Sequence, residues 1–415
     1  MAKKMVISGW KEELKKSLSG KEYDRHIALL EKFEEKFGAG RELSLFSAPG
    51  RTEIGGNHTD HQHGRVLAAS VNLDTVAAVS ENGTDTVNIQ SEGYRLCTVN
   101  LGDLSVRDNE KNTTLALIRG VCAAFREMGC EIRGFDAYVI SDVLRGSGLS
   151  SSAAYEVLLG VILNGMYFEN KVDAVKIAQI GQYAENVYFG KPSGLMDQMA
   201  SSVGNLVTID FNDPKNPVVE RVDFDFSKTG HSLCIIDSGA DHADLTDEYA
   251  AITVELGKIS GYFGKTVLRD VPKDDFYAAI PALRKLAGDR AVLRAMHFYD
   301  DNDRVPQQVQ ALKDDDFASF LNLMKESGRS SWMYLQNVVP AGYTEHQEVA
   351  LALAMCDKLL AGKGAYRVHG GGFAGTVQAF VPNDMLETFK QKIEAVLGEG
   401  SCHVLSIRPV GGMEF

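Results

Sequence analysis

Apolar residues along this chain recur with two different periods, which predicts that helices and strands are mixed from end to end. Stretches with an apolar residue at every second position predict strands, and stretches with one at every third or fourth position predict helices. The expected strands are 43–48, 66–79, 87–90, 135–143, 206–211, 232–238, 402–410 and the two arms of a glycine hairpin within 366–381. The expected helices are 23–37, 114–128, 151–168, 174–188, 345–360 and 384–397, and helical patterns dominate 244–326. Because the two kinds of element do not alternate strictly, the pattern predicts an α+β fold.

The composition shifts near residues 210–217, where Asn212-Asp213-Pro214 is typical of a turn. A chain of 415 residues is long enough for two or three domains. We therefore expect an N-terminal domain over 1–215 and a C-terminal domain over 216–415.

Composition and charge favour a cytoplasmic enzyme that acts on a small molecule. Hydrophobic residues make up 44% of the chain, which is ample for a packed core. The net charge of −13 argues against nonspecific binding to nucleic acid or membranes, and no apolar run approaches the roughly 18 residues of a membrane span. The six cysteines are scattered without a Cys-x-x-Cys motif, which indicates buried thiols in a reducing compartment. We expect a monomer with no nucleic-acid or membrane partner.

Residues 145–155 read Arg-Gly-Ser-Gly-Leu-Ser-Ser-Ser-Ala-Ala-Tyr and carry the densest chemical signal. Gly146 and Gly148 allow backbone angles and close approaches that a side chain would block. The serines at 150–152 fall where a helix is expected to start, and a helix N-terminus attracts anions. The order strand, glycine-serine loop, helix suggests a cradle for a triphosphate. An ordinary serine-capped helix after a glycine turn explains this segment alone equally well.

The common nucleotide-binding patterns do not fit this chain. Gly264-Lys265-Thr266 matches the end of a Walker loop, but the glycine required five residues earlier is replaced by Ile259. Residues 370–375 match Gly-x-Gly-x-x-Gly, but a strand is expected after them where a dinucleotide site needs a helix. We interpret this segment as a hairpin whose backbone passes close to another part of the protein.

A second polar stretch, 48–62, is rich in glycine and poor in large apolar residues, so we expect a loop. Arg51 is suited to stabilising charge on a transferring phosphoryl group. Further along, hydrogen-bonding side chains suited to gripping a sugar are Asn57, His58 and Asp60. A metal site made by His58, Asp60, His61 and His63 is an alternative, although their spacing matches no known zinc motif. A solvated loop is the other alternative.

A third stretch places two carboxylates, Glu185 and Asp197, on either side of the turn at 190–194. One carboxylate could bind Mg²⁺, which prefers oxygen ligands, and the other could accept a proton from a substrate hydroxyl. Two surface acids on neighbouring elements would give the same pattern.

Together these motifs resemble the galactokinase branch of the family of galactokinase, homoserine, mevalonate and phosphomevalonate kinases. The resemblance runs from about residue 37 to the C-terminus, with the motifs in family order and at family spacing. The matching motifs are Ala-Pro-Gly-Arg with Gly-x-His-Thr-Asp (48–60), Gly-Leu-Ser-Ser-Ser-Ala (148–153), Ser-Gly-Leu-Met-Asp-Gln (193–198), the segment 242–249 and the glycine hairpin 370–375.

The resemblance implies a two-domain α+β kinase with its active site between the lobes. It also implies ATP and Mg²⁺, and in-line transfer of the ATP γ-phosphoryl group to a sugar hydroxyl, giving a sugar 1-phosphate and ADP.

The resemblance also implies a role for each matching residue. Asp197 would be the base, or the anion that orients the sugar C1 hydroxyl, and Arg51 would stabilise the transferring phosphoryl group. Ser152 and Glu185 would bind Mg²⁺. The phosphates would be cradled by Gly146, Ser147, Gly148, Leu149, Ser150, Ser151 and Ser152. The sugar would be bound by Asn57, His58, Asp60, Gly194 and Tyr249.

The sugar loop departs from the family pattern, which usually reads Gly-Arg-Val-Asn-Leu-Ile-Gly-Glu-His-Thr-Asp-Tyr. Here Asn57 replaces the glutamate and His61 replaces the tyrosine. Asparagine keeps an acceptor and adds donors but removes the negative charge. Galactose stays the expected sugar, with arabinose, galacturonate and N-acetylgalactosamine as alternatives.

Two further classes remain open from the sequence. One is a non-catalytic sensor that binds a sugar and ATP, and the other is an amino-acid or isoprenoid-pathway kinase of the same superfamily. The residues expected to do the chemistry are all present, which favours an enzyme: Arg51, Ser152, Glu185 and Asp197.

Overall fold

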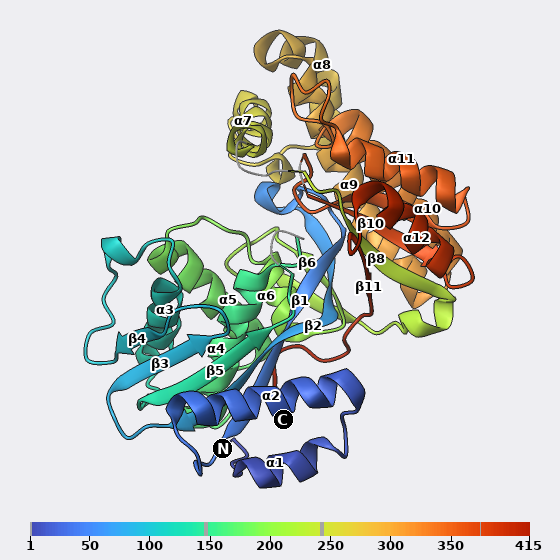
Figure 1. The fold of residues 1–415 in the computed structure, drawn as a ribbon. Helices are drawn as coiled ribbons and strands as arrows, with labels where there is room; N and C mark the ends of the chain where they lie inside the picture. Colours follow the sequence, from blue (N-terminus) through green and yellow to red (C-terminus); the bar gives the residue numbers. More distant parts are fainter. Residues whose placement is uncertain (1, 145–147, 241–244, 374) are drawn as a thin grey trace.

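The computed structural model describes residues 2–144, 148–240, 245–373 and 375–415, whose strands form two sheets (Figure 1). The larger sheet contains β1 (Ser44–Gly55), β2 (Arg65–Glu81), β3 (Thr86–Ser91), β4 (Cys97–Asn100), β5 (Phe135–Ser141), β6 (Leu206–Asp210), β7 (Val218–Val222) and β12 (Met413–Glu414). The smaller sheet contains β8 (His231–Asp237), β9 (Ala365–His369), β10 (Thr376–Pro382) and β11 (Cys402–Leu405).

The larger sheet is built around the long antiparallel pair β1 and β2, which extends towards the smaller sheet in Figure 1. Its strand order is β12-β1-β2-β5-β3-β4, and β6 pairs with both β2 and β7. Only the β3–β5 pair is parallel among the described strands. The smaller sheet is antiparallel throughout, in the order β11-β8-β10-β9.

Helices cover both faces of the larger sheet (Figure 1). Helices α1 (Ile7–Leu14) and α2 (Gly20–Phe37) pack on one face, and α3 (Thr114–Glu127), α4 (Ser151–Tyr167) and α5 (Ala174–Tyr183) lie on the other. Alternate residues of β2 serve the two cores: Val76 and Ala78 pack with α1 and α2, whereas Ala77 and Val79 pack with α3 and α4. This is the period of two expected of a strand buried on both faces.

The smaller sheet is also covered on both faces. Leu233 and Phe380 pack in one core with α9 (Asp289–Lys313) and α10 (Phe317–Ser330). The neighbouring Cys234 and Val381 pack in another core with α11 (Glu348–Leu360) and α12 (Leu386–Leu397). The remaining helices are α6 (Met196–Val203), α7 (Thr246–Tyr262) and α8 (Lys273–Ala287).

The expected loop at 48–62 is wrong over its first half, because strand β1 continues through it to Gly55. All twelve residues of β1 are buried, and its pairing with β2 shifts register between Pro49 and Arg51 and again before Gly55. The polar residues that suggested a loop have partners inside the protein; for example, Thr52 Oγ1 lies 3.0 Å from His369 Nε2. A polar stretch can therefore form a buried strand when a second layer supplies its hydrogen bonds.

Several element boundaries also differ from those expected. Helices α1 and α6 and strands β4, β7 and β12 were not expected, and the strand expected over 402–410 ends at Leu405. The helix expected over 174–188 is α-helical only to Tyr183 and then widens into a π-helix at Ala184–Phe189. The α+β fold class is confirmed. The domain boundary near 215 stays a prediction, and β7 beyond it still pairs with β6.

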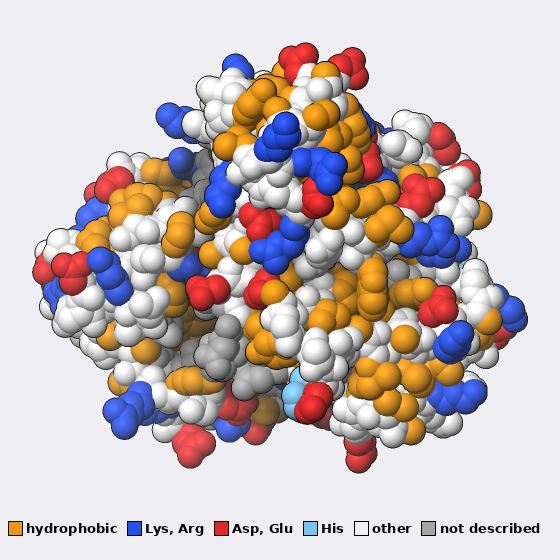
Figure 2. All heavy atoms as spheres, turned by 90° about the horizontal axis from the view of Figure 1, so that it is seen from above, with side chains coloured by type: hydrophobic (Ala, Val, Ile, Leu, Met, Phe, Trp, Pro, Cys, Tyr) orange, Lys and Arg blue, Asp and Glu red, His pale blue; other side chains and the backbone are white. Residues whose placement is uncertain are grey.

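None of the helices in the described parts of the chain is both long enough and apolar enough to cross a membrane. The face of the molecule in Figure 2 carries acidic and basic side chains intermixed. All six cysteines are free; five are buried as expected, whereas Cys97 is partly exposed, contrary to the prediction.

Candidate active site

Three predicted residues from three elements meet at one point. Arg51 on β1 donates from Nε to Asp197 Oδ1 (2.7 Å), at the start of α6. Ser150, at the N-cap position of α4, donates from Oγ to the other oxygen of the same carboxylate (2.5 Å). The arginine, the carboxylate and the expected phosphate-binding helix therefore form one connected unit.

The electrostatics of this unit keep Asp197 charged. Burial alone would raise the pKa of Asp197, but the charge of Arg51 and hydrogen bonds from Arg51 and Ser150 lower it below its ordinary value. A carboxylate with a lowered pKa is a weak base. Asp197 is thus suited first to orienting a hydroxyl and to receiving its proton only as the hydroxyl becomes acidic.

The predicted phosphate cradle lies at the N-terminus of α4. Ser150 has φ of 55° and makes no side-chain cap with the described part of the helix, because its hydroxyl is turned to Asp197. Gly148 has φ of 70°, and a Cβ there would lie 3.1 Å from His369 Nδ1. Leu149 is buried, and its carbonyl accepts from the backbone N–H of Arg51 (3.0 Å). The predicted residues Gly146 and Ser147 lie outside the described residues.

Glu185 lies in the π-helix that follows α5 and is buried. Its carboxylate accepts from Ser193 Oγ (2.6 Å) and Gln198 Nε2 (2.9 Å) and pairs with Lys191 Nζ (3.2 Å). The same Gln198 amide donates to a second buried acid, Glu156 (2.9 Å). Burial and the proximity of Glu185 raise the pKa of Glu156 well above its ordinary value, which favours the neutral form of Glu156. Glu185 is therefore the acid of this pair that is suited to a cation.

Gly194 lies against Asp60 of the predicted sugar loop (50–61), which also carries His58. His58 Nε2 donates to the carbonyl oxygen of Gly371 (2.9 Å), and burial lowers the pKa of His58 to about 4, so the ring is neutral. A Cβ on Gly194 would lie 2.8 Å from Asp60 Oδ2, so a larger residue there would require the Asp60 side chain to move.

The glycine hairpin between β9 and β10 passes close to two other elements, as its sequence predicted. A Cβ on Gly371 would lie 2.6 Å from the ring of Tyr249, and one on Gly372 would lie 2.0 Å from the carbonyl oxygen of Asn337. Tyr249 on α7 donates its hydroxyl to the carbonyl oxygen of Gly372 (2.8 Å). The prediction for Tyr249 came from the motif at 242–249, and residues 242–244 of that motif lie outside the described residues.

Replacing Gly372 by alanine is expected to lower the free energy of unfolding by about 2–4 kcal/mol. The backbone strain at a φ of 81° contributes about 1–2 kcal/mol, and the contact with Asn337 adds overpacking. The shift of the urea unfolding transition measures the loss. Gly264→Ala is the matched control, because Gly264 also has positive φ (66°) but has no atom within 4 Å of its Cβ position. Equal losses in both variants would show that the close approach carries no energy.

Asn57, a predicted sugar-binding residue, lies in the interior of the protein. It has no exposed surface, and its Nδ2 donates to the carbonyl oxygen of Gly370 (2.6 Å) and to Glu53 Oε1 (3.0 Å). His58 and Tyr249 line a cavity, whereas Asn57 lies behind the hairpin that forms its wall.

The cavity at this site has a volume of about 490 Å³. Predicted residues that line it are His58, Gly148 and Tyr249, and the hairpin contributes Gly370, Gly371 and Gly375. The sequence interpretation missed Lys191, Thr253 and His369, which also line it. Two features of the sequence could have indicated two of them: Lys191 lies between the carboxylates of Glu185 and Asp197, and His369 directly precedes three glycines.

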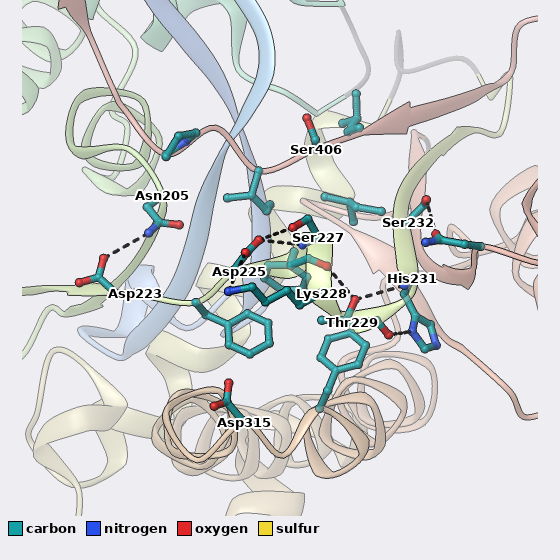
Figure 3. Close-up of a pocket in the computed structure, with 18 residues that line it drawn as sticks. Asn205, Asp223, Asp225, Ser227, Lys228, Thr229, His231, Ser232, Asp315 and Ser406 are labelled. Atoms are coloured by element: carbon teal, nitrogen blue, oxygen red, sulfur yellow. Dashed lines mark hydrogen bonds and ion pairs between the residues drawn. The ribbon is translucent and has the colours of Figure 1, made fainter.

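A larger cavity of about 1200 Å³ lies elsewhere, between the start of β8, the segment after β7 and the chain that follows β11 (Figure 3). Its polar side chains are paired with one another, such as Asp225 with Ser227 (2.6 Å) and Lys228 (3.2 Å). None of the predicted site residues lines it. The smaller cavity is therefore the candidate active site.

The alternative metal site at His58, Asp60, His61 and His63 finds no support. Among the described residues, no group of three or more His, Cys, Asp or Glu side chains is placed to hold a metal ion. His61 Nε2 lies 3.9 Å from Asp60 Oδ1, and His58 is bonded to the hairpin.

Known proteins that resemble this chain include galactokinases. The family model described as galactokinase galactose-binding signature matches residues 31–81, and the GHMP kinases N terminal domain matches residues 116–205. A galactokinase of Streptomyces coelicolor is 30% identical over 366 residues, covering 88% of this chain and 91% of the relative. A galactokinase of Glaesserella parasuis is 31% identical over 385 residues, covering 87% and 91%. The crystal structure of Lactococcus lactis galactokinase complexed with galactose superposes with a TM-score of 0.78 at 26% identity, covering 94% of this chain and 99% of that one.

Proposed function

We propose, because this chain belongs to the galactokinase family, that it transfers the γ-phosphoryl group of ATP to the C1 hydroxyl of galactose. The observation that carries this proposal is the contact of Arg51 with Asp197 beside the N-terminus of α4, next to a cavity of sugar size. A donor suited to the phosphates and a carboxylate suited to the hydroxyl lie close to a polar cavity, which supports the proposal.

Each of these residues contributes differently to an in-line transfer. The sugar oxygen forms a bond to the γ-phosphorus while the bond to the leaving oxygen of ADP breaks, and the hydroxyl proton passes to Asp197. Arg51 fixes Asp197 through Nε and is placed to offset the charge of the transferring phosphoryl group. The N-terminus of α4 supplies backbone N–H groups and the positive end of its dipole to the phosphates.

Ser152 and Glu185 would hold Mg²⁺, which prefers oxygen ligands and takes few protein ligands beside phosphates and water. When bound, Mg²⁺ would neutralise phosphate charge. Glu185 is already oriented by Ser193 and Gln198, so its carboxylate is held in place for this role. Six free cysteines are in keeping with the cytoplasmic location that we propose.

Replacing Glu185 by glutamine is expected to raise the Mg²⁺ concentration needed for half-maximal activity by about tenfold or more. The substitution keeps the size of the side chain and removes its charge. A titration of Mg²⁺ at fixed ATP measures the effect. Glu156→Gln is the matched control, because the pKa of Glu156 is raised well above its ordinary value by burial and the amide resembles its neutral form. A shift of similar size in both variants would contradict the assignment to Glu185.

One observation favours galacturonate as a second candidate substrate. Among the described residues that line the cavity, none is an aspartate or glutamate, whereas His61 and Lys191 are present. A lysine in the cavity wall suits a sugar that carries a negative charge.

A coupled ADP-release assay with ATP, Mg²⁺ and five sugars tests the proposal. The panel is galactose, arabinose, galacturonate, N-acetylgalactosamine and glucose. Turnover that is highest with galactose supports the galactokinase function, and highest turnover with galacturonate supports the second candidate. ADP release that no sugar stimulates would refute both and favour a non-catalytic sensor.

A further inference from the structure

The wall of the cavity formed by the glycine hairpin is held from behind by side chains. The carbonyl oxygen of Gly370 accepts from Asn57 Nδ2 (2.6 Å), and that of Gly371 accepts from His58 Nε2 (2.9 Å) and Asn337 Nδ2 (3.2 Å). Gly370 and Gly371 both line the cavity. The position of this wall therefore depends on the groups that hold its two carbonyls.

Asn57 is at the centre of that support and has no atom left for a ligand. One amide hydrogen is directed to Gly370 and the other to Glu53 Oε1 (3.0 Å), while Oδ1 accepts from Asn337 Nδ2 (2.9 Å). Its backbone N–H donates to Asp301 Oδ2 (2.8 Å), and the side chain has no exposed surface. An asparagine has two donors and one acceptor oxygen, and here all are used inside the protein.

Glu53, which fixes the amide of Asn57, is itself fixed by a buried arginine from the other sheet. Arg367 on β9 is fully buried and donates to Glu53 Oε1 and to the carbonyl oxygen of Ile54 (2.7 Å). Glu53 is 4% exposed. The chain of contacts thus runs from Arg367 through Glu53 and Asn57 to Gly370, and it joins β1 of the larger sheet to the hairpin of the smaller one.

We propose that Asn57, held by the Glu53–Arg367 pair, is a positioning residue that sets the Gly370–Gly371 wall of the sugar cavity and does not contact the sugar. This inference rests on the proposed function, because it takes the cavity to be the sugar site. Asn57 thereby changes from an expected sugar contact to a support of the cavity wall, and Glu53 and Arg367 join it in that role.

The isosteric substitution Asn57→Asp tests the role. It replaces two donors by acceptors that face the Glu53 carboxylate and the Gly370 carbonyl oxygen, so the wall loses its support without a change in volume. We expect the KM for galactose to rise about tenfold or more, because the groups that bind the sugar are displaced. The KM for ATP should stay within about twofold of the wild-type value. The ratio of kcat/KM between galactose and arabinose should also stay within about twofold, because the wall is displaced for both sugars.

A second substitution separates the loss of the Gly370 contact from charge repulsion. The double variant Glu53→Gln/Asn57→Asp leaves one negative charge near Arg367, but the Gly370 carbonyl oxygen still lacks its donor. We expect the KM for galactose to stay raised, within about twofold of that of Asn57→Asp. Recovery of the KM would attribute the effect to charge repulsion alone and would refute the positioning role.

Asn164→Asp is the matched control. Asn164 is also buried, and its amide holds the backbone of Val172, with Nδ2 2.8 Å from the carbonyl oxygen and Oδ1 3.1 Å from N–H. It lies on α4 and does not line the cavity. We expect this change to lower the melting temperature but to leave the KM for galactose within about twofold of wild type.

The outcomes distinguish the inference from the proposed function. If Asn57→Asp behaves like Asn164→Asp, lowering only the melting temperature, the positioning role is refuted. If Asn57→Asp changes the ratio of kcat/KM between galactose and arabinose, Asn57 contacts the sugar, and the inference is refuted for that reason. A wild-type protein that turns over none of the five sugars refutes the proposed function and the role of the wall together.

Discussion

Replacing Asp197 by asparagine is expected to lower kcat by about 10³-fold, because the variant can neither receive the hydroxyl proton nor hold its charge beside Arg51. Asparagine has the same size as aspartate and keeps one acceptor for the Arg51 Nε donor, which lies 2.7 Å from Asp197 Oδ1 in the wild type. The KM for ATP should change little, since we propose that the nucleotide is held mainly by the α4 N-terminus. Steady-state ADP release measures both constants.

The control for this variant is Asp289→Asn. Asp289 also pairs with an arginine, Arg284 (2.6 Å), but on the surface and away from the cavity. Its replacement should leave kcat unchanged. If Asp197→Asn kept more than about a tenth of the wild-type kcat, a role as proton acceptor or orienting anion would be excluded.

Replacing Arg51 by methionine is expected to lower kcat by about 10³-fold and to change its pH dependence. An arginine that stabilises the transferring phosphoryl group is worth about this factor or more. Burial raises the pKa of Asp197, and the charge of Arg51 is the main cause that lowers it. Without that charge the pKa of Asp197 rises, so Asp197 becomes protonated at a higher pH. As the pH is lowered, the variant should therefore lose its residual activity at a higher pH than the wild type does.

A pH profile of kcat for wild type and variant checks this direction. In the wild type the lowered pKa keeps Asp197 charged down to a pH below the ordinary aspartate value of about 3.9. Arg284→Met removes a surface arginine from a comparable pair and should alter neither kcat nor the profile. A fall in kcat for Arg51→Met with an unshifted acid limb would show that Arg51 does not act through the charge of Asp197.

The period of the apolar residues was sufficient to predict the α+β class and most helices, because burial of one or both faces imposes the period. The helix at Ser151–Tyr167 and the strand before it appear close to where they were expected. The stretch 48–55 was misjudged for a physical reason: its polar residues are buried in β1 with partners such as His369, hundreds of residues away in the sequence. A local pattern contains no information about such partners.

The sequence by itself determined which chemistry this protein carries. Arginine, serine and aspartate at family spacing indicated a phosphoryl transfer to a sugar, and the family comparison agrees with that interpretation. The tertiary structure alone decided how these groups meet, such as Arg51 with Asp197, 146 residues apart. It also decided that Asn57 faces Glu53 and Gly370 behind the cavity wall, although its place in the motif suggested a sugar contact. A motif identifies the residue types at a site, whereas the direction of each side chain depends on partners that folding brings from distant segments.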